Sequence, residues 1–426
     1  MNPLASHKMR GCGRPLVTLP VACATRGPHW LNNTRLCIYS AVALIGYFVF
    51  FAFYLYRAFW QQRAGLSPLA MDFLPFWSAS FLALQGHALD AYNVSALTAV
   101  EIATVPYFRT TDSILPWLYP PNSLLLISPL ALLPYKAAAV TFIGGTLAMF
   151  VKAIHSIVPR WHTVFVAFAF PGVALAAVAG QNGLLTAALA AFGLLTLRRH
   201  PLVAGICFGL LCIKPQLALL FPFALLCSRS WRALASCTLT AVLTLALAAF
   251  VFGTGTYTAF LHNAGMAAGF VESGRAALAR VPTLFALMKL AHAPDALAYA
   301  AQGLSALMSV AAVWYAWRHE CSYALRAATL ICASLLVSPY LYDYDLAWYG
   351  VLAAWYCKYG LICGWKRWER EWLIVLWLAP LAGMTVIAYV PFQFLPLLSL
   401  ITLGMLVRRI TLERHSAPLF PPDPYS

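Results

Sequence analysis

Charged side chains are scarce in this sequence, and acidic ones are the scarcest. Only 10% of the 426 residues are charged, with 13 Asp and Glu against 28 Lys and Arg, whereas 62% are hydrophobic. A soluble domain has roughly 25% charged residues, and a globular core could not hide this much apolar surface. The chain also lacks a polar block long enough for a separate soluble domain. These absences favour one membrane domain.

Two further absences limit the chemistry. The eleven cysteines lie mostly inside apolar runs, and no Cys/His spacing is of the zinc type. We therefore expect neither disulfides nor a metal site. The net charge of +15 is compatible with nucleic-acid binding, but the cations are spread between apolar runs instead of forming one basic face. We expect no nucleic-acid partner.

Apolar runs of about 17 to 25 residues, long enough to cross a hydrocarbon core, recur along the chain. They predict an all-α polytopic membrane protein with about 11 to 13 transmembrane helices. The first run, residues 36–60, exceeds a signal-peptide core of about 7 to 15 residues and should be retained as a helix. We expect a flexible tail at 1–35, with Met9 as an alternative start, a membrane domain at 36–410 and a second tail at 411–426.

The charges predict an orientation. If the N-terminal tail is cytoplasmic, the Lys and Arg clusters between apolar runs fall on the cytoplasmic side, as the positive-inside rule requires. Segments 61–119 and 253–295 then become outer loops. Eight acids lie outside: Asp72, Asp90, Glu101, Asp112, Glu272, Asp295, Asp343 and Asp345. Because the rule leaves acids nearly free, their gathering on the periplasmic or extracellular face of a bacterial inner membrane indicates chemistry there.

The first outer segment holds the leading catalytic candidate. Phe73 to Leu84 carries aromatic and apolar residues near helical spacing, as expected of a helix lying in the membrane interface. Asp72 immediately precedes this helix. Partial burial would raise the pKa of its carboxyl toward the range of a general base. A helix N-cap, a position that favours Asp, is an equally weighted alternative.

Further along the segment, His87, Asp90 and Tyr92 could bind sugar hydroxyls, although a helix stop after Gly86 with a solvated turn is the favoured interpretation. Tyr119-Pro120-Pro121 marks re-entry into the membrane. Gln181 and Asn182 lie in a turn between two short apolar helices. Their amides could hold a sugar or phosphate, against the simpler alternative of a tight turn.

Two later motifs complete the candidates. Lys214, followed by Pro215, has apolar sequence on both sides, so its charge either snorkels to the interface or meets an anion such as a lipid phosphate. Asp343 and Asp345 alternate with tyrosines over residues 340–345, a composition that suits sugar hydroxyls. Capping aspartates in an aromatic belt are the alternative for that segment.

Taken in order, the motifs form a set: Asp72-Phe73, Gly86 to Tyr92, Tyr119-Pro120-Pro121, Ser128-Pro129-Leu130, Leu133-Pro134, Gly180-Gln181-Asn182, Ala204-Gly205 through Lys214-Pro215, and Ser338-Pro339. This set, spread over roughly residues 40–400, resembles glycosyltransferase family 87. The family comprises polyprenyl-phosphate-mannose-dependent α-mannosyltransferases and their relatives in the GT-C class. Each motif is short, and it is the ordered combination that carries the resemblance.

The resemblance implies a GT-C type bundle that moves a hexose, mannose in the family, from a polyprenyl-phosphate sugar to a lipid or glycan acceptor with inversion. It implies no nucleotide sugar and no obligatory metal or other cofactor. The partners would be membrane lipids, the lipid-linked donor and the acceptor. By the same resemblance, Asp72 stands in the place of the catalytic aspartate and Lys214 near the donor phosphate. Arg109, Arg275 or Arg280 could add positive charge.

One departure from the family pattern concerns the Ser-Pro pair. Family members tend to carry histidines just after it, whereas this chain has Asp343, Tyr344 and Asp345. Two other classes remain as alternatives to the enzyme: a transporter or flippase for a lipid-linked glycan, and a non-catalytic scaffold. Ionisable residues are nearly absent from span centres, where ion pathways need them. That scarcity disfavours the transporter, and the acids gathered outside disfavour the scaffold.

Overall fold

The computed structural model describes residues 29–59, 70–105, 115–272 and 278–415. All regular elements in these ranges are helices, which confirms the predicted all-α class. The long helices are α1 (Asn33–Phe59), α5 (Tyr135–Ile157), α12 (Trp231–Phe252), α13 (Gly255–Glu272), α15 (Asp295–Arg318), α18 (Glu369–Tyr389) and α19 (Leu395–His415). The first of these matches the expected retained helix, and the last continues beyond the expected domain end at 410.

The shorter helices are α2 (Leu74–Leu84), α3 (Val94–Thr104), α4 (Asn122–Ile127), α6 (Trp161–Phe168), α7 (Pro171–Ala179), α8 (Gly183–Thr196), α9 (Pro201–Leu210), α10 (Pro215–Ala218), α11 (Leu220–Cys227), α14 (Leu284–Leu290), α16 (Tyr323–Val337) and α17 (Trp348–Cys363). Short 3₁₀ turns join them: η1 (Met71–Phe73), η2 (Ala88–Tyr92), η4 (Ser128–Leu132), η5 (Leu211–Ile213), η6 (Leu278–Arg280) and η7 (Asp343–Ala347). Residues 121–151 contain α4, η4 and most of α5.

Fewer helices than the expected 11 to 13 are long enough to span a membrane alone. In the described ranges six qualify by length and composition, or seven if α6 and α7, bent by 49°, form one span. That bend lies at Pro171, the first residue of α7, because proline restricts the preceding residue to extended backbone. The remaining apolar runs are divided by turns into helices of 10–17 residues, including α8, α9 with η5, and α16.

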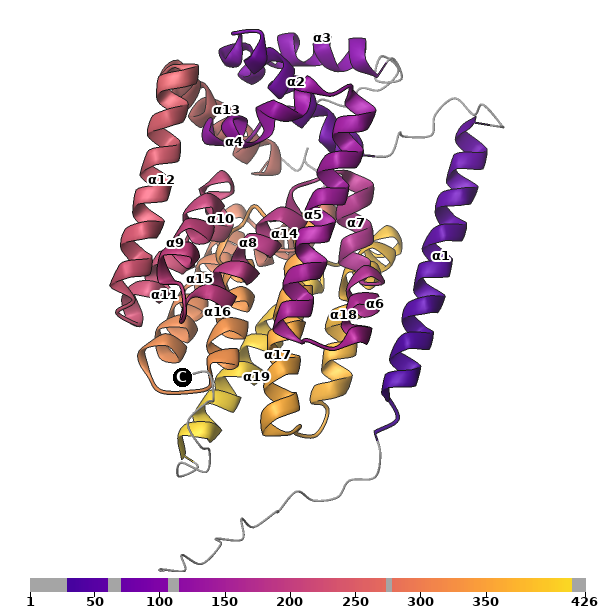
Figure 1. Ribbon diagram of the computed structural model, residues 1–426, viewed down its shortest axis with the longest axis vertical. Helices are drawn as coiled ribbons and strands as arrows, with labels where there is room; N and C mark the ends of the chain where they lie inside the picture. The colour runs from indigo at the N-terminus through magenta and orange to yellow at the C-terminus, as the bar shows by residue number, and fades with distance from the viewer. Residues whose placement is uncertain (1–28, 60–69, 106–114, 273–277, 416–426) are drawn as a thin grey trace, which may run out of the picture.

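These short helices form the centre of the bundle. Twelve consecutive or near-consecutive residues of α16 are buried, and α8 and α17 are buried along much of their lengths. A helix that is apolar all round belongs in an interior. At the other extreme, only 6% of the α1 span is buried, and Figure 1 shows α1 standing beside the bundle. The short helices therefore build the core on which the polar turns are mounted.

A separate helical layer covers one end of the bundle, where α2 and α3 lie across the other helices (Figure 1). It has its own apolar cluster, which includes the buried Phe73, Phe76 and Trp117. The expected helix at 73–84 is confirmed as α2, but η2 and η4 pack against it, so one side is buried in protein. Segment 253–295, which we expected to be an outer loop, is largely helical as well, because α13, η6 and α14 occupy much of it.

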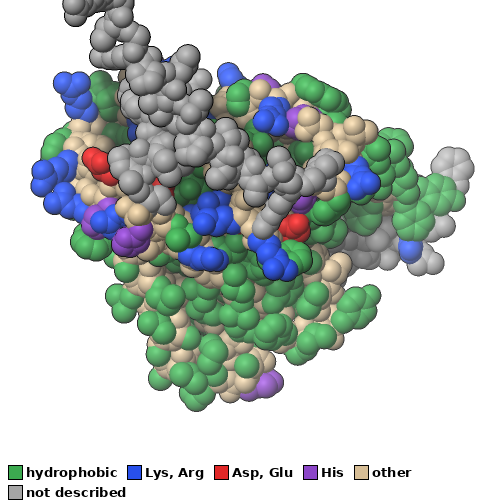
Figure 2. All heavy atoms as spheres, turned by 90° about the horizontal axis from the view of Figure 1, so that it is seen from below, with side chains coloured by type: hydrophobic (Ala, Val, Ile, Leu, Met, Phe, Trp, Pro, Cys, Tyr) green, Lys and Arg blue, Asp and Glu red, His purple; other side chains and the backbone are tan. Residues whose placement is uncertain are grey.

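Cations gather at the opposite end. Figure 2 views the molecule from that end and shows many Lys and Arg side chains with few acids. Exposed arginines there lie at helix junctions, including Arg160 before α6, Arg199 after α8 and Arg232 in α12. The structure thus separates the cation-rich end from the α2–α3 layer, which is the separation that the charge pattern predicts.

Candidate active site

Asp72 is held in η1 by a well-anchored segment. The preceding Ala70 has φ of +58°. Its N–H donates to the carbonyl of Val178 at 2.8 Å, and its own carbonyl accepts from the Tyr135 hydroxyl at 3.1 Å. The N-cap position of α2 is Phe73, and neither η1 nor α2 has a side-chain cap. The N-cap interpretation of Asp72 therefore finds no support in these two helices.

The Asp72 carboxylate instead faces an arginine from a distant part of the chain. Arg280 Nη2 donates to Asp72 Oδ2 at 3.1 Å. The same guanidinium donates to Asp343 twice, from Nε at 2.9 Å and from Nη2 at 3.1 Å. Paired donors of this kind match the two oxygens of a carboxylate. One cation thus holds two acids from η1 and η7 together, and 42% of its side chain stays exposed.

Burial and charge act on Asp72 in opposite directions. Desolvation raises the pKa of the Asp72 carboxyl above its usual value, the neighbouring Asp343 adds to that rise, and Arg280 opposes it by charge and hydrogen bonding. The two carboxylates raise the pKa of Arg280, so the guanidinium stays charged. A carboxylate with a raised pKa that keeps partial access to solvent, 19% here, has the properties of a general base.

A second ion pair lies deeper, at Lys214. Its ammonium donates to Asp345 at 2.5 Å and to Asn182 at 3.4 Å, and it lies 4.6 Å from the centre of the Tyr344 ring. Lys214 is 3% exposed and Asp345 is fully buried. Buried charges of opposite sign need each other, because neither can be left without a partner. The ammonium therefore does not snorkel to the interface. It joins η7, which follows α16 and contains Asp345, to the end of η5.

The turn at Gly180–Gly183 connects the two ion pairs. Gly180 ends α7 with φ of +75°, and a Cβ there would come within 2.8 Å of Phe73 Cβ. A Cβ on Gly183 would lie 2.1 Å from the Tyr344 carbonyl oxygen. Only glycine permits both approaches. Within the turn, Gln181 accepts from the Tyr119 hydroxyl at 2.8 Å and donates to the Asp72 carbonyl at 3.4 Å.

Other predicted site residues lie elsewhere or outside the described ranges. His87 and Asp90 lie in exposed positions at η2 and contact each other at 3.4 Å, and Gly86 has φ of +82° just after α2. This geometry matches the interpretation of residues 86–92 as a helix stop followed by a solvated turn. Tyr92 is buried and its hydroxyl donates to the Tyr119 carbonyl at 2.9 Å. Arg109 and Arg275 lie outside the described residues.

The structure brings together Asp72, Tyr119, Gln181, Asn182, Lys214, Asp343 and Asp345 from the sequence candidates. Arg280, which the sequence offered only as one of three arginines, is the residue that joins the carboxylates. Nothing in the residues around it distinguishes it from other loop arginines, because its partners are 63 and 208 positions away. Among the described residues, no three His, Cys, Asp or Glu side chains come together as metal ligands would.

Fold and site together define a helical membrane protein with a partly buried, ion-paired carboxylate cluster between a surface layer and the bundle. The sequence model of glycosyltransferase family 87 matches residues 117–339, more than half of the chain. The chain belongs to glycosyltransferase family 87 and is a glycosyltransferase. The matched range contains Tyr119, Lys214 and Arg280 but ends before Asp343 and begins after Asp72. No curated protein and no solved structure matches the sequence.

Proposed function

We propose that this glycosyltransferase has a GT-C type bundle and moves a hexose, mannose by the family resemblance, from a polyprenyl-phosphate sugar to a lipid or glycan acceptor. Transfer would invert the anomeric centre and take place in a cell membrane at the end away from the cation-rich face. The observation that carries this proposal is the Asp72–Arg280–Asp343 cluster. It combines a base with a raised pKa and a cation for an anionic leaving group, which is what such a transfer needs.

The proposed step begins with Asp72 accepting the proton of the acceptor hydroxyl. The hydroxyl oxygen forms the new bond to the anomeric carbon while the bond from that carbon to the lipid phosphate breaks. The phosphate leaves with the electron pair of that bond. Arg280 is placed to receive the developing negative charge, because its guanidinium is partly exposed and already adjoins the base. No nucleotide or metal ion enters this step.

The second ion pair has a different proposed role. Within the part of the chain that the structure describes, the Lys214 ammonium contacts Asp345, Asn182 and the Tyr344 ring, all of them protein groups. We therefore assign direct contact with the donor phosphate to Arg280. Lys214 holds η7 in place and so positions Asp343 against the guanidinium. Asp343, Tyr119 and the Gln181 amide line the same site and are the groups proposed to meet sugar hydroxyls.

The reaction is tested with purified protein in lipid vesicles that contain an acceptor lipid extract. Polyprenyl-phosphate mannose labelled in the sugar should lose its label to a new lipid or glycan product, whereas the labelled nucleotide sugar should not. Polyprenyl-phosphate glucose measures the sugar preference. Transfer from the nucleotide sugar alone would refute the donor class.

The orientation has its own test. Ser95 in α3 and Arg232 at the start of α12 are both exposed. Helix α3 belongs to the layer at one end of the molecule, whereas α12 begins toward the other end (Figure 1). In a background without native cysteines, Ser95→Cys should react with an impermeant maleimide in intact cells and Arg232→Cys only after lysis. The reverse pattern would place the proposed site on the cytoplasmic side.

A further inference from the structure

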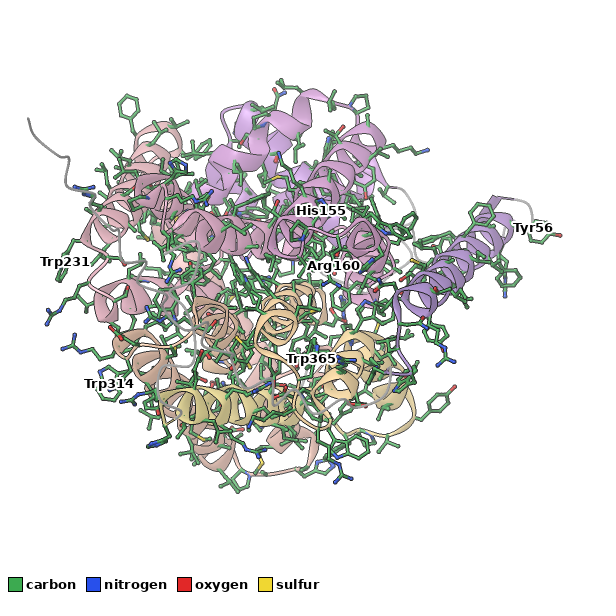
Figure 3. All side chains as sticks on the ribbon, turned by 60° about the horizontal axis from the view of Figure 1, so that its bottom comes forward. Tyr56, His155, Arg160, Trp231, Trp314 and Trp365 are labelled. Atoms are coloured by element: carbon green, nitrogen blue, oxygen red, sulfur yellow. The ribbon has the colours of Figure 1, made fainter. Side chains whose placement is uncertain are left out.

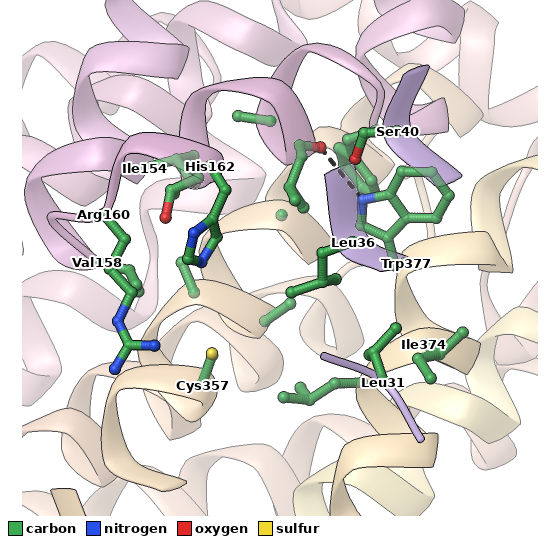
Figure 4. Close-up of a pocket in the computed structure, with 18 of the residues that line it drawn as sticks. Leu31, Leu36, Ser40, Ile154, Val158, Arg160, His162, Cys357, Ile374 and Trp377 are labelled. Carbon is green, nitrogen blue, oxygen red and sulfur yellow. Dashed lines mark hydrogen bonds between the residues drawn. The ribbon is translucent and has the colours of Figure 1, made fainter. Parts of the chain in front are cut away.

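A large cavity lies far from the Asp72 cluster, toward the cation-rich end, between α1 and the rest of the bundle. Its volume is about 670 Å³, within the range of small-molecule sites. Side chains from α1, α5, α6, α17 and α18 line it, and most of them are apolar, including Leu36, Ile154 and Trp377. Figure 4 shows these side chains facing one another around the space.

The outer wall of this cavity is the single helix α1. That helix has few contacts with the bundle apart from those to α6, and the Tyr47 hydroxyl donates to the Ala169 carbonyl at 3.0 Å. Both α1 and α18 are long and apolar enough to cross a membrane. The cavity is partly open, and α1, α5 and α18, which contribute to its walls, are all among these spans.

Two arginines and a histidine are among the polar residues of the cavity lining. They are Arg160, His162 and Arg370, and Figure 4 shows Arg160 and His162 with Cys357 on one side of the space. Figure 3 shows Arg160 on the same side of the bundle as Trp365, whose ring lies 5.3 Å from the Arg370 guanidinium. Arg160 and Arg370 therefore both bring positive charge to the lining of this cavity.

These polar groups are short of partners. In the described ranges neither Arg160 nor Arg370 has an ion pair with a carboxylate, and the adjacent acid Glu371 bonds His29 at 3.1 Å. His162 is 7% exposed, and its Nδ1 atom is buried with no hydrogen-bond partner in the described residues. A buried polar atom without a partner needs an explanation. Two cations and an unsatisfied imidazole at one end of an apolar cavity complement an anion with hydrocarbon attached.

We propose that this cavity binds an anionic glycerophospholipid, with its phosphate between Arg160 and Arg370 beside His162 and its acyl chains along α1. Basic pockets between membrane helices recognise lipid headgroups in this way. A soluble phosphate would not use the apolar lining, and a zwitterionic lipid would leave the two guanidinium groups without a net anion. The bound lipid fills the space behind α1 and fixes that helix to the bundle. This site is separate from the proposed glycosyl-transfer site.

The test uses the full-length protein, delipidated in a neutral detergent, with phosphatidylglycerol, phosphatidylcholine or polyprenyl phosphate added. Phosphatidylglycerol should raise Tm and remain bound in native mass spectrometry, and phosphatidylcholine should do so much less. The variant Arg160→Gln/Arg370→Gln should bind phosphatidylglycerol about thirtyfold more weakly, at roughly fivefold per removed charge. Arg232→Gln/Arg408→Gln removes two exposed arginines that do not line the cavity and should bind like the unaltered protein.

Each other outcome contradicts the proposal. Equal effects of the two lipids would mean that hydrocarbon alone fills the cavity. Equal losses in the two double variants would mean a general surface-charge effect. Retention of polyprenyl phosphate but not phosphatidylglycerol would assign the cavity to a different lipid. As a measurement that does not depend on the arginine variants, alkylation of Cys357 by N-ethylmaleimide, followed by peptide mass spectrometry, should slow with phosphatidylglycerol and not with phosphatidylcholine.

Discussion

The substitution Asp72→Asn examines the centre of the proposed mechanism. Asparagine has nearly the shape of aspartate and keeps an oxygen that can accept from Arg280, but it cannot take a proton. The ion pair that it removes is partly exposed, with 42% of the Arg280 side chain accessible. Screening by water limits the contribution of such a pair to about 0–1 kcal/mol. We expect little change in Tm or in the amount of protein in the membrane.

The rate should respond much more strongly. Loss of a general base typically lowers the rate by about 10² to 10⁴, which corresponds to about 3 to 5 kcal/mol in the barrier. The assay is single-turnover transfer from saturating labelled polyprenyl-phosphate sugar, with donor binding measured separately. Because Asp72 must be deprotonated to act, transfer by the unaltered protein should fall as the pH drops through its raised pKa, above the ordinary value of about 3.9.

Two matched variants make the result decisive. Asp90→Asn is the same chemical change at an exposed turn and should leave turnover unchanged. Asp343→Asn removes the other carboxylate held by Arg280 and should weaken substrate binding more than the proton-transfer step. Turnover of Asp72→Asn within about threefold of the unaltered protein, less than roughly 1 kcal/mol in the barrier, would refute the assignment. A large loss of turnover in Asp343→Asn alone would transfer the role to that residue.

Three further predictions concern the ion pairs. Arg280→Met removes the group that lowers the pKa of the catalytic carboxyl, so the acid limb of the kcat/KM profile should move to higher pH; movement to lower pH would contradict this. Lys214→Met leaves the buried Asp345 carboxylate without its cation and should lower the free energy of unfolding by about 3–5 kcal/mol, measured by denaturation. The double variant Lys214→Met/Asp345→Leu should regain most of the lost stability, and no recovery would refute the pairing. Arg409 donates to Glu369 at 2.6 and 2.7 Å, and both side chains are almost fully buried. Arg409→Met should therefore lower Tm by an amount comparable to Lys214→Met, while kcat per folded molecule stays unchanged. An unchanged Tm would mean that this ion pair does not contribute to stability.

Features that depend on local composition could be predicted from the sequence alone. Hydropathy over a window of about 20 residues is enough to identify a membrane-spanning helix, so α1 and the all-α class followed from the apolar runs. The turns at Gly180, Lys214-Pro215 and Ser338-Pro339 were visible as breaks in those runs. The separation of cations from acids along the chain also predicted the two differently charged ends, because orientation rules act on the charges next to each span.

Which polar residues contact one another depends on the three-dimensional packing of the helices. Asp72 and Arg280 are 208 positions apart and Lys214 and Asp345 are 131 apart, and no periodicity in the sequence relates them. The number of full-length spans also depends on tertiary packing. Short apolar helices such as α8 and α16 do not cross the membrane alone, because their side chains are buried among other helices. The local pattern of apolar residues determines which segments leave water. The pairing of buried charges depends instead on how those segments pack, because a charge removed from water needs an opposite charge within a few ångströms.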